Sequence, residues 1–225
     1  MKTLGIAAKW IFILCLPILL MSASIGVAIN SLGMYKYGFE KYNISQTTGL
    51  AEAELDRAAA GLISYFNSGE EHISVYVTKD GGQFKLFNQR EVIHLKDVKG
   101  LIWLNYRFLL GTLLYVLIYA GVVLLWRKGW RRLASGIVGG SGLTLVLMLA
   151  LGMGALLSFD RLFLQFHLIS FTNEFWQLDP ARDYLIMLFP QGFWYDAFRF
   201  CGLVTAGVTV ILGGVGLVYS KRAQG

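Results

Sequence analysis

Two histidines, His94 and His167, stand in the two most polar stretches that border apolar segments of this sequence. The first lies in EVIHLKDVKG, residues 91–100, and the second in an aromatic-rich stretch from Asp160 to Pro190. Imidazole changes its charge near neutral pH, so a pair of imidazoles can take a proton from one reacting atom and give it to another. The third histidine, His72, follows Gly-Glu-Glu and is typical of a solvated loop.

Acids, an amide and a tryptophan accompany the two histidines and are candidates for orienting them or for binding a substrate. These residues are Glu91, Asp97, Asn173, Glu174, Trp176 and Asp179. Arg107 follows the first stretch inside an apolar segment, where a charge is by default a functional hypothesis. Near the end of a span, an arginine can instead extend its charge to the membrane interface.

A metal site is the alternative use of the same residues. Glu91 and His94 stand three apart, like the carboxylate and histidine of metal-binding helices, and His167 and Glu174 would be further ligands. However, no HExxH spacing occurs, and both cysteines, Cys15 and Cys201, lie in apolar segments. We therefore expect no metal and no cofactor, and two free thiols. A Gly-x-Ser-x-Gly motif for serine chemistry is also absent from the sequence.

The composition is that of an integral membrane protein. Of 225 residues, 56% are hydrophobic and 15% are charged, which is outside the range of soluble domains. Spanning roughly 30 Å of hydrocarbon takes about 20 apolar residues in a helix. Four segments have this length: 10–30, 101–126, 133–157 and 201–219.

The net charge of +6 predicts membrane orientation and not nucleic-acid binding. The two tails and the RKGWRR hairpin contain basic residues and no acid: Lys2, Lys9, Arg127, Lys128, Arg131, Arg132, Lys221 and Arg222. Short basic connections remain in the cytoplasm. We therefore expect a multi-pass protein of the cell membrane with both termini cytoplasmic and both histidine stretches on the extracytoplasmic side.

The predicted fold class is a mainly α integral membrane protein, with four transmembrane helices and a small α+β extracytoplasmic domain. The polar segments between the four spans divide into a cytoplasmic tail (1–9), the α+β domain (31–100), a basic cytoplasmic hairpin (127–132), an extracytoplasmic interfacial segment (158–200) and a second cytoplasmic tail (220–225). The glycines of the third span favour close helix packing.

Local patterns predict the elements that position the candidate residues. Apolar residues from Leu50 to Phe66 recur at helical spacing, which predicts a helix of about five turns with Thr48 as its N-cap. ISVYVT and QFKLFN, separated by KDGG, predict a β-hairpin. After residue 158 a continued helix would place His167, Ser170, Phe171 and Glu174 along one face. Asp179-Pro180 then predicts the start of a short helix that ends at Pro190.

At these two stretches the sequence resembles a family of four-span bacterial membrane proteins of Gram-positive type, the lipoprotein intramolecular transacylases, known as Lit. The number and order of the spans agree over nearly the whole chain. Glu174 stands where the family pattern favours Asp. The matching residues are Glu91, His94, Asp97 and Val98 in the first stretch, and Phe166, His167, Phe171, Asn173, Trp176, Leu178, Asp179, Pro180, Leu185, Phe189 and Pro190 in the second.

The resemblance implies an acyltransferase that moves the sn-2 acyl chain of a diacylglyceryl lipoprotein onto the α-amino group of its N-terminal cysteine. The product is a lyso-form lipoprotein, and the family's two essential histidines would correspond to His94 and His167. Diacylglyceryl-modified lipoproteins and membrane lipid would be the partners. Two alternatives stay open: a non-catalytic membrane sensor or assembly protein, and a metal-dependent membrane hydrolase.

Overall fold

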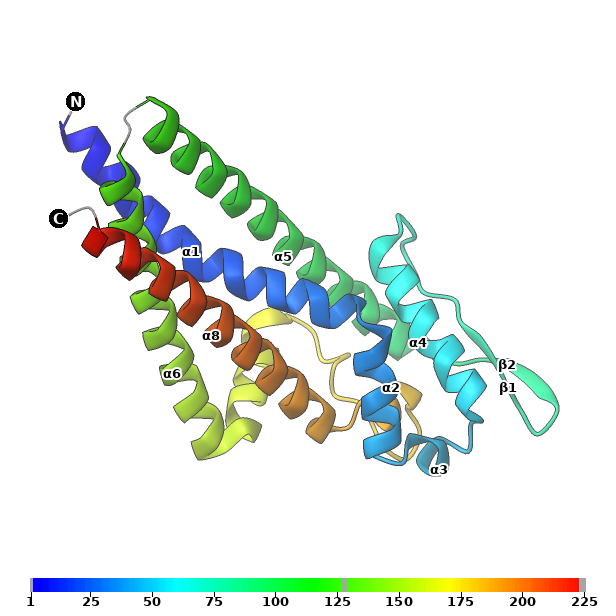
Figure 1. Ribbon diagram of the computed structural model, residues 1–225. Helices are drawn as coiled ribbons and strands as arrows, with labels where there is room; N and C mark the ends of the chain where they lie inside the picture. The colour runs from blue at the N-terminus through cyan, green and yellow to red at the C-terminus, as the bar shows by residue number, and fades with distance from the viewer. Residues whose placement is uncertain (1, 127–128, 223–225) are drawn as a thin grey trace. The chain divides into compact units, whose positions relative to one another are not determined.

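The computed structural model describes residues 2–126 and 129–222, and most of them are helical (Figure 1). Within these residues, four helices are long and apolar enough to cross a membrane, as the sequence predicts. They are α1 (Lys2–Asn30), α5 (Gln89–Gly121), α6 (Trp130–Ser170) and α8 (Gln191–Arg222). A π-helical segment, η1 (Val122–Trp126), extends α5. Arg127 and Lys128 of the predicted basic hairpin lie outside the described residues.

Two of these helices are longer than the apolar segments that they contain. α5 has 33 residues and α6 has 41, which correspond to about 50 and 60 Å at a rise of about 1.5 Å per residue. A hydrocarbon core of roughly 30 Å accounts for only part of each. The polar residues 89–100 and 159–170 therefore continue the spans as helix. Ser158 (φ −167°, ψ 94°) interrupts the helical geometry of α6 where its polar part begins.

The chain divides into two compact units. Unit 1 contains residues 1–26, 105–158 and 200–225, and it holds most of the apolar helical length. Unit 2 contains residues 27–104 and 159–199, and both histidine stretches belong to it.

Unit 2 contains the predicted α+β elements. They are α2 (Leu32–Lys41), α3 (Ile44–Thr48), α4 (Glu52–Asn67), the strands β1 (Tyr76–Lys79) and β2 (Gly82–Lys85), and α7 (Tyr184–Leu188). The strands pair antiparallel, with Tyr76 opposite Lys85 and Lys79 opposite Gly82. Asp80 (φ 53°) and Gly81 (φ 79°) form the turn. Two consecutive positive φ angles are typical of a two-residue hairpin turn, so the predicted hairpin is confirmed.

Three details of unit 2 differ from the predictions. Thr48 is not the N-cap of the long helix: it ends α3, and α4 begins at Glu52 after Ala51. Its hydroxyl bonds instead to the carbonyl oxygen of Ile44 at 2.7 Å. α6 ends at Ser170, so Phe171 and Glu174 do not lie on a helix face with His167. Asp179 does not begin a helix, because α7 begins five residues later at Tyr184.

In unit 1, glycines of α6 allow close packing against α1, as their number predicts. A Cβ atom on Gly140 would lie 2.8 Å from Cδ2 and 2.9 Å from Cβ of Leu16. Some polar groups within the apolar helices are paired, although the buried hydroxyls of Tyr119 and Ser141 have no hydrogen-bond partner among the described residues. The hydroxyls of Ser24 and Thr205 lie 2.8 Å apart, and Asn105 donates to the carbonyl oxygen of Ser22 at 3.1 Å. Both cysteines are free, as predicted.

We predict that Gly140→Ala lowers the thermal stability of the detergent-solubilised protein, because the added methyl group cannot fit against Leu16. Overpacking of this kind costs about 1–3 kcal/mol. Gly142→Ala is the matched control, since a Cβ atom there meets nothing within 4 Å and alanine is the better helix former by about 1 kcal/mol. Apparent melting temperatures would test this. Equal melting temperatures for the two variants would contradict the packing argument.

Candidate active site

The first turns of α5 hold His94 in place. Asn88 and Glu91 form a capping box at the start of the helix: the Glu91 carboxylate accepts the backbone N–H of Asn88 at 2.7 Å, and the Asn88 side chain accepts that of Glu91 at 3.1 Å. His94 follows one turn later with an exposed fraction of 7%. Among the described residues, no group hydrogen-bonds to its buried Nδ1 atom.

His167 lies in the last turn of α6. Its Nδ1 atom is 2.7 Å from the carbonyl oxygen of Phe163. A carbonyl oxygen only accepts hydrogen bonds, so Nδ1 carries a proton and donates it. In the neutral ring this arrangement leaves the lone pair on Nε2, which is the nitrogen available to a reacting group.

The two imidazole rings face each other. Their centroids are 6.3 Å apart and their planes are inclined by 26°. The residues that carry them lie far apart in sequence, on α5 and α6, so the pair depends on the fold of unit 2. The structure therefore brings His94 and His167 together, as their similar distances from adjacent spans predict.

Aromatic side chains surround the pair. Phe171 meets His94 edge-on, with centroids 5.0 Å apart. Trp176 lies 5.0 Å from His167 between ring centroids, and Phe163 lies 4.4 Å from it. Phe166 also contacts His167, at 5.4 Å. Because an apolar surrounding disfavours a charged imidazole, this enclosure favours the neutral form of the buried His94.

Asp97 and Asn173 connect the two histidine stretches. Nδ2 of Asn173 donates to the Asp97 carboxylate at 2.8 Å, and Oδ1 of Asn173 accepts the backbone N–H of Phe175 at 3.0 Å. Arg90 of α5 donates to the carbonyl oxygen of Glu174 at 2.8 Å. The residues after α6 have little regular structure, so these bonds set the position of the segment that contains Trp176.

Glu91 acts on the backbone and not on the histidines. Its side chain is 1% exposed, and its second oxygen accepts the N–H of Leu185 in α7 at 2.6 Å. Next to it, Asn88 donates to the Asp183 carboxylate at 2.7 Å, and that carboxylate also accepts the N–H of Asp179 at 2.7 Å. This network joins the start of α5 to the chain from Asp179 to Leu185.

The remaining predicted site residues have other contacts or belong to the other unit. The side chain of Asp179 accepts the N–H of Ala181 and contacts Arg182 at 3.7 Å, so Asp179 stabilises a turn. Glu174 is exposed and takes part through its carbonyl oxygen. Arg107 is exposed and belongs to unit 1. Within residues 2–126 and 129–222, no three His, Cys, Asp or Glu side chains are grouped as metal ligands.

Further bonds fix the start of α5 against the rest of unit 2. Lys96 pairs with Glu71 at 2.5 Å, and its hydrogen bond lowers the pKa of the Glu71 carboxyl. Lys99 donates to the carbonyl oxygen of Glu70 at 2.6 Å and lies 4.2 Å above the ring of Tyr65. Trp103 donates to the carbonyl oxygen of Phe66 at 3.0 Å. The helix that carries His94 is therefore held along three successive turns.

A sequence model of the family "Lipoprotein intramolecular transacylase Lit" matches residues 10–194, which include every element of the histidine pair. The chain belongs to this family. As a member, it is an acyltransferase, as the resemblance of the two histidine stretches implies.

One curated relative and two solved structures illustrate the similarity. An uncharacterised protein from Aquifex aeolicus (strain VF5) is 30% identical over 167 residues, which are 73% of this chain and 72% of the relative. The solved structure of the membrane-integral Lit from Bacillus cereus matches with a TM-score of 0.86 at 19% identity, covering 100% of this chain and 99% of that one. A variant of the same protein with one histidine replaced by alanine matches at 0.80 and 18%, covering 99% and 96%. The Lit fold with four apolar helices makes this chain a multi-pass membrane protein.

Two features of the site were not predicted from the sequence. The capping box of Asn88 and Glu91 has the spacing that defines this motif, so the sequence did contain a signal that Glu91 serves the helix start. The carbonyl oxygen of Phe163 that orients His167 had no such signal, because any residue one turn earlier would present the same atom.

We predict that Glu91→Ala destabilises the protein while Glu174→Ala does not. Removing the buried carboxylate leaves the N–H groups of Asn88 and Leu185 without an acceptor, at a cost of about 2–4 kcal/mol in the free energy of unfolding. The exposed Glu174 should change it by at most about 0.5 kcal/mol. Thermal unfolding in detergent would measure both. A stable Glu91→Ala variant without activity would instead place Glu91 in the chemistry.

Proposed function

We propose that the protein transfers the sn-2 acyl chain of a diacylglyceryl lipoprotein to the α-amino group of the N-terminal cysteine of that lipoprotein, leaving the lyso-form. The observation that carries this proposal is the facing pair of imidazoles, 6.3 Å apart between centroids, inside an aromatic enclosure. Acyl transfer from an ester to an amine needs one proton removed from nitrogen and one delivered to oxygen, and two imidazoles suit these tasks.

In this proposal, His167 is the proton acceptor. The bond from its Nδ1 to the carbonyl oxygen of Phe163 fixes the ring orientation and leaves the Nε2 lone pair free. A histidine whose second nitrogen is held in this way has the tautomer and orientation that a general base requires. The adjacent ring of Trp176, 5.0 Å away, favours the imidazolium that forms transiently.

His94 is the proton donor. Buried N–H groups without a partner are rarer than buried acceptors without one, so the proton of the neutral ring is best placed on Nε2 and not on the unpartnered Nδ1. His94 then presents an N–H group where His167 presents a lone pair. In the free protein, His94 is thus ready to give a proton and His167 is ready to accept one.

The atoms of the proposed reaction balance without a covalent enzyme intermediate. The neutral amine attacks the ester carbonyl, a C–N bond forms, and the proton of the nitrogen passes to His167. The C–O bond to glycerol then breaks, and the leaving oxygen receives a proton from His94 while His94 takes the proton held by His167. This coupled transfer avoids an imidazolate anion and returns both rings to the neutral form. Because both reacting groups belong to one lipoprotein, holding them together can supply much of the rate.

Asn173 is the proposed donor to the oxyanion of the tetrahedral intermediate. An amide has two N–H groups, and only one is needed for the bond to Asp97. Asp97 lies one turn after His94 on α5, so the bond keeps the amide near the pair. Phe166 and Trp176 are the proposed apolar contacts for the acyl chain.

The proposed orientation places both termini in the cytoplasm and the histidine pair on the extracytoplasmic side. It rests on the basic residues of the tails and of the segment between α5 and α6, and on the absence of Asp and Glu from the sequence of those segments. Diacylglyceryl lipoproteins anchored in the outer leaflet would then reach the site from the membrane.

We predict that His94→Ala and His167→Ala each reduce acyl transfer by at least about 100-fold, because general acid–base groups contribute factors of about 10²–10⁴. The exposed His72 is the matched control, and His72→Ala should retain full activity. The measurement is mass spectrometry of the N-terminal peptide of a lipoprotein from cells that contain each variant. An unchanged acylation pattern with and without the wild-type protein would remove this function altogether and favour a sensor or assembly role.

We also predict that activity in detergent survives prolonged treatment with EDTA, because the proposed steps use imidazole protons only. The measurement is the initial rate of lyso-form production before and after chelation. Loss of activity with EDTA and recovery with zinc would instead indicate a metal-dependent hydrolase.

A further inference from the structure

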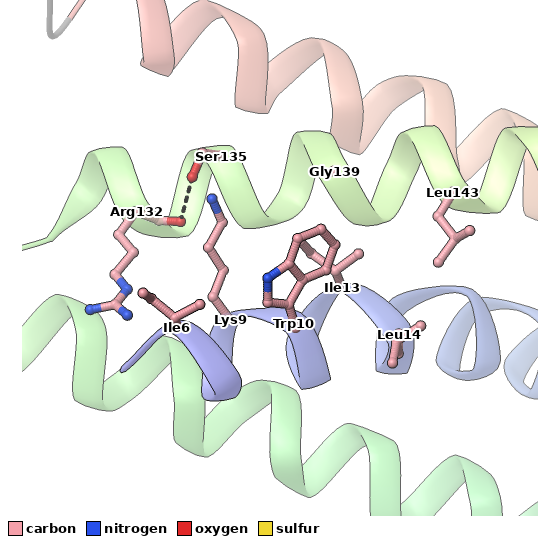
Figure 2. A pocket seen from close by; sticks show the side chains of 9 residues that line it. All are labelled: Ile6, Lys9, Trp10, Ile13, Leu14, Arg132, Ser135, Gly139 and Leu143. Carbon is pink, nitrogen blue, oxygen red and sulfur yellow. Dashed lines mark hydrogen bonds between the residues drawn. The ribbon is translucent and has the colours of Figure 1, made fainter. Parts of the chain in front are cut away.

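A groove runs along the outer surface of unit 1 between α1 and α6 (Figure 2). Its volume is about 830 Å³. Apolar side chains and one glycine line most of its length, including Ile13, Leu14, Gly139 and Leu143, and two cations, Lys9 and Arg132, line one end. The groove is therefore apolar along its length and positively charged at its end.

The two cations come from different helices and line the same end of the groove. Figure 2 shows Lys9 extending from α1 towards α6, and Arg132 extending from α6 towards α1. The guanidinium of Arg132 lies where a side chain on Gly5 would be, since a Cβ atom there would contact its nitrogens. A glycine at residue 5 thus leaves the space that the guanidinium occupies.

Neither cation has a counter-ion within unit 1. The sequence of this unit contains no Asp or Glu, and among the described residues Lys9 and Arg132 form no ion pair. Two positive charges that line one end of an apolar groove, with no acid in the unit, attract a negatively charged group. An anionic ligand would complement the charge of this end of the groove.

Aromatic residues indicate the depth of the two cations in the membrane. Trp10 follows Lys9 directly and is 60% exposed, and Trp130 lies two residues before Arg132 and is 58% exposed. Trp130 also stacks on Tyr219 of α8, with centroids 6.3 Å apart. Exposed tryptophans and tyrosines at the ends of spans lie at the level of lipid headgroups. Lys9 and Arg132 are therefore at the height of lipid phosphates.

We propose that this groove binds one anionic glycerophospholipid, with its phosphate at the end lined by Lys9 and Arg132 and an acyl chain along Ile13, Leu14 and Leu143. Basic pockets between transmembrane helices bind anionic headgroups in this way. A lipid fits better than free phosphate because the apolar part of the groove continues from the cations and faces lipid: Leu14 is 56% exposed. Gly139 keeps its floor open next to Ile13. This site is separate from the histidine pair, and the proposal does not rest on the proposed reaction.

The first test measures lipid selectivity of the purified full-length protein by native mass spectrometry in a neutral detergent. Phosphatidylglycerol and phosphatidylcholine with identical acyl chains are titrated separately, and glycerol 3-phosphate tests the headgroup alone. The expected result is tighter binding of phosphatidylglycerol and no retained glycerol phosphate. Equal binding of the two lipids would overturn the proposal, and equally tight binding of glycerol phosphate would show an anion site without a lipid.

The second test locates the binding in the groove. Lys9→Gln and Arg132→Gln should each weaken binding of phosphatidylglycerol by about fivefold, which corresponds to roughly 1 kcal/mol per cation near a headgroup. The double variant should bind both lipids equally. Arg131→Gln is the matched control, because it removes the same charge from an exposed neighbour that does not line the groove.

A loss of selectivity in Arg131→Gln equal to that in Arg132→Gln would overturn the site in favour of general surface charge. Retained selectivity in the double variant would overturn it as well. If the double variant does not fold, the two single variants and the lipid comparison on the wild-type protein still decide the outcome. Lipoprotein acylation is a separate measurement, so failure of this proposal is distinguishable from failure of the proposed function.

Discussion

The buried carboxylate of Glu91 is the constraint on which the geometry of unit 2 depends. A carboxylate that is 1% exposed would be costly without partners. It accepts one backbone N–H at the start of α5 and another, from Leu185, in α7. One side chain therefore fixes the helix that carries His94 relative to the chain that returns from the second histidine stretch. Glu91 binds backbone groups and not the imidazoles. It therefore helps to position the pair without taking part in it.

One face of α5 also organises the irregular segment after α6. Arg90, His94 and Asp97 are four and three residues apart, which places them on the same side of a helix. Arg90 bonds to the carbonyl oxygen of Glu174, and Asp97 bonds to Asn173. Backbone groups outside regular structure need partners from elsewhere. Arg90 supplies one for the carbonyl oxygen of Glu174, and Asp97 holds the side-chain amide of Asn173 on the other side of the histidine. The segment with Trp176 is thus held at the height of His94.

The sequence was sufficient for the spans, the hairpin and the pair, because each depends on a strong local pattern. Twenty apolar residues, Asp80-Gly81 between alternating strands, and the similar distances of His94 and His167 from adjacent spans need little tertiary information. The boundaries of the helices were harder to predict from the sequence than the spans and the hairpin. Thr48 and Asp179 have the side chains of N-caps, but each accepts the backbone N–H of the second residue after it, in a turn that precedes the helix. Only the three-dimensional environment decides between such uses. The bond from Leu185 to Glu91 and the bond from His167 to the carbonyl oxygen of Phe163 depend on contacts that sequence spacing does not specify.

The aromatic enclosure and the two tautomers are consistent with each other physically. The proposed transfer moves one proton from nitrogen to oxygen and takes up none overall, so it needs no proton from bulk water. The aromatic rings around the buried His94 disfavour a permanent charge on that imidazole, and in the proposed mechanism His94 needs none before the substrate binds. In the same proposal, the two histidines together return every proton that they take.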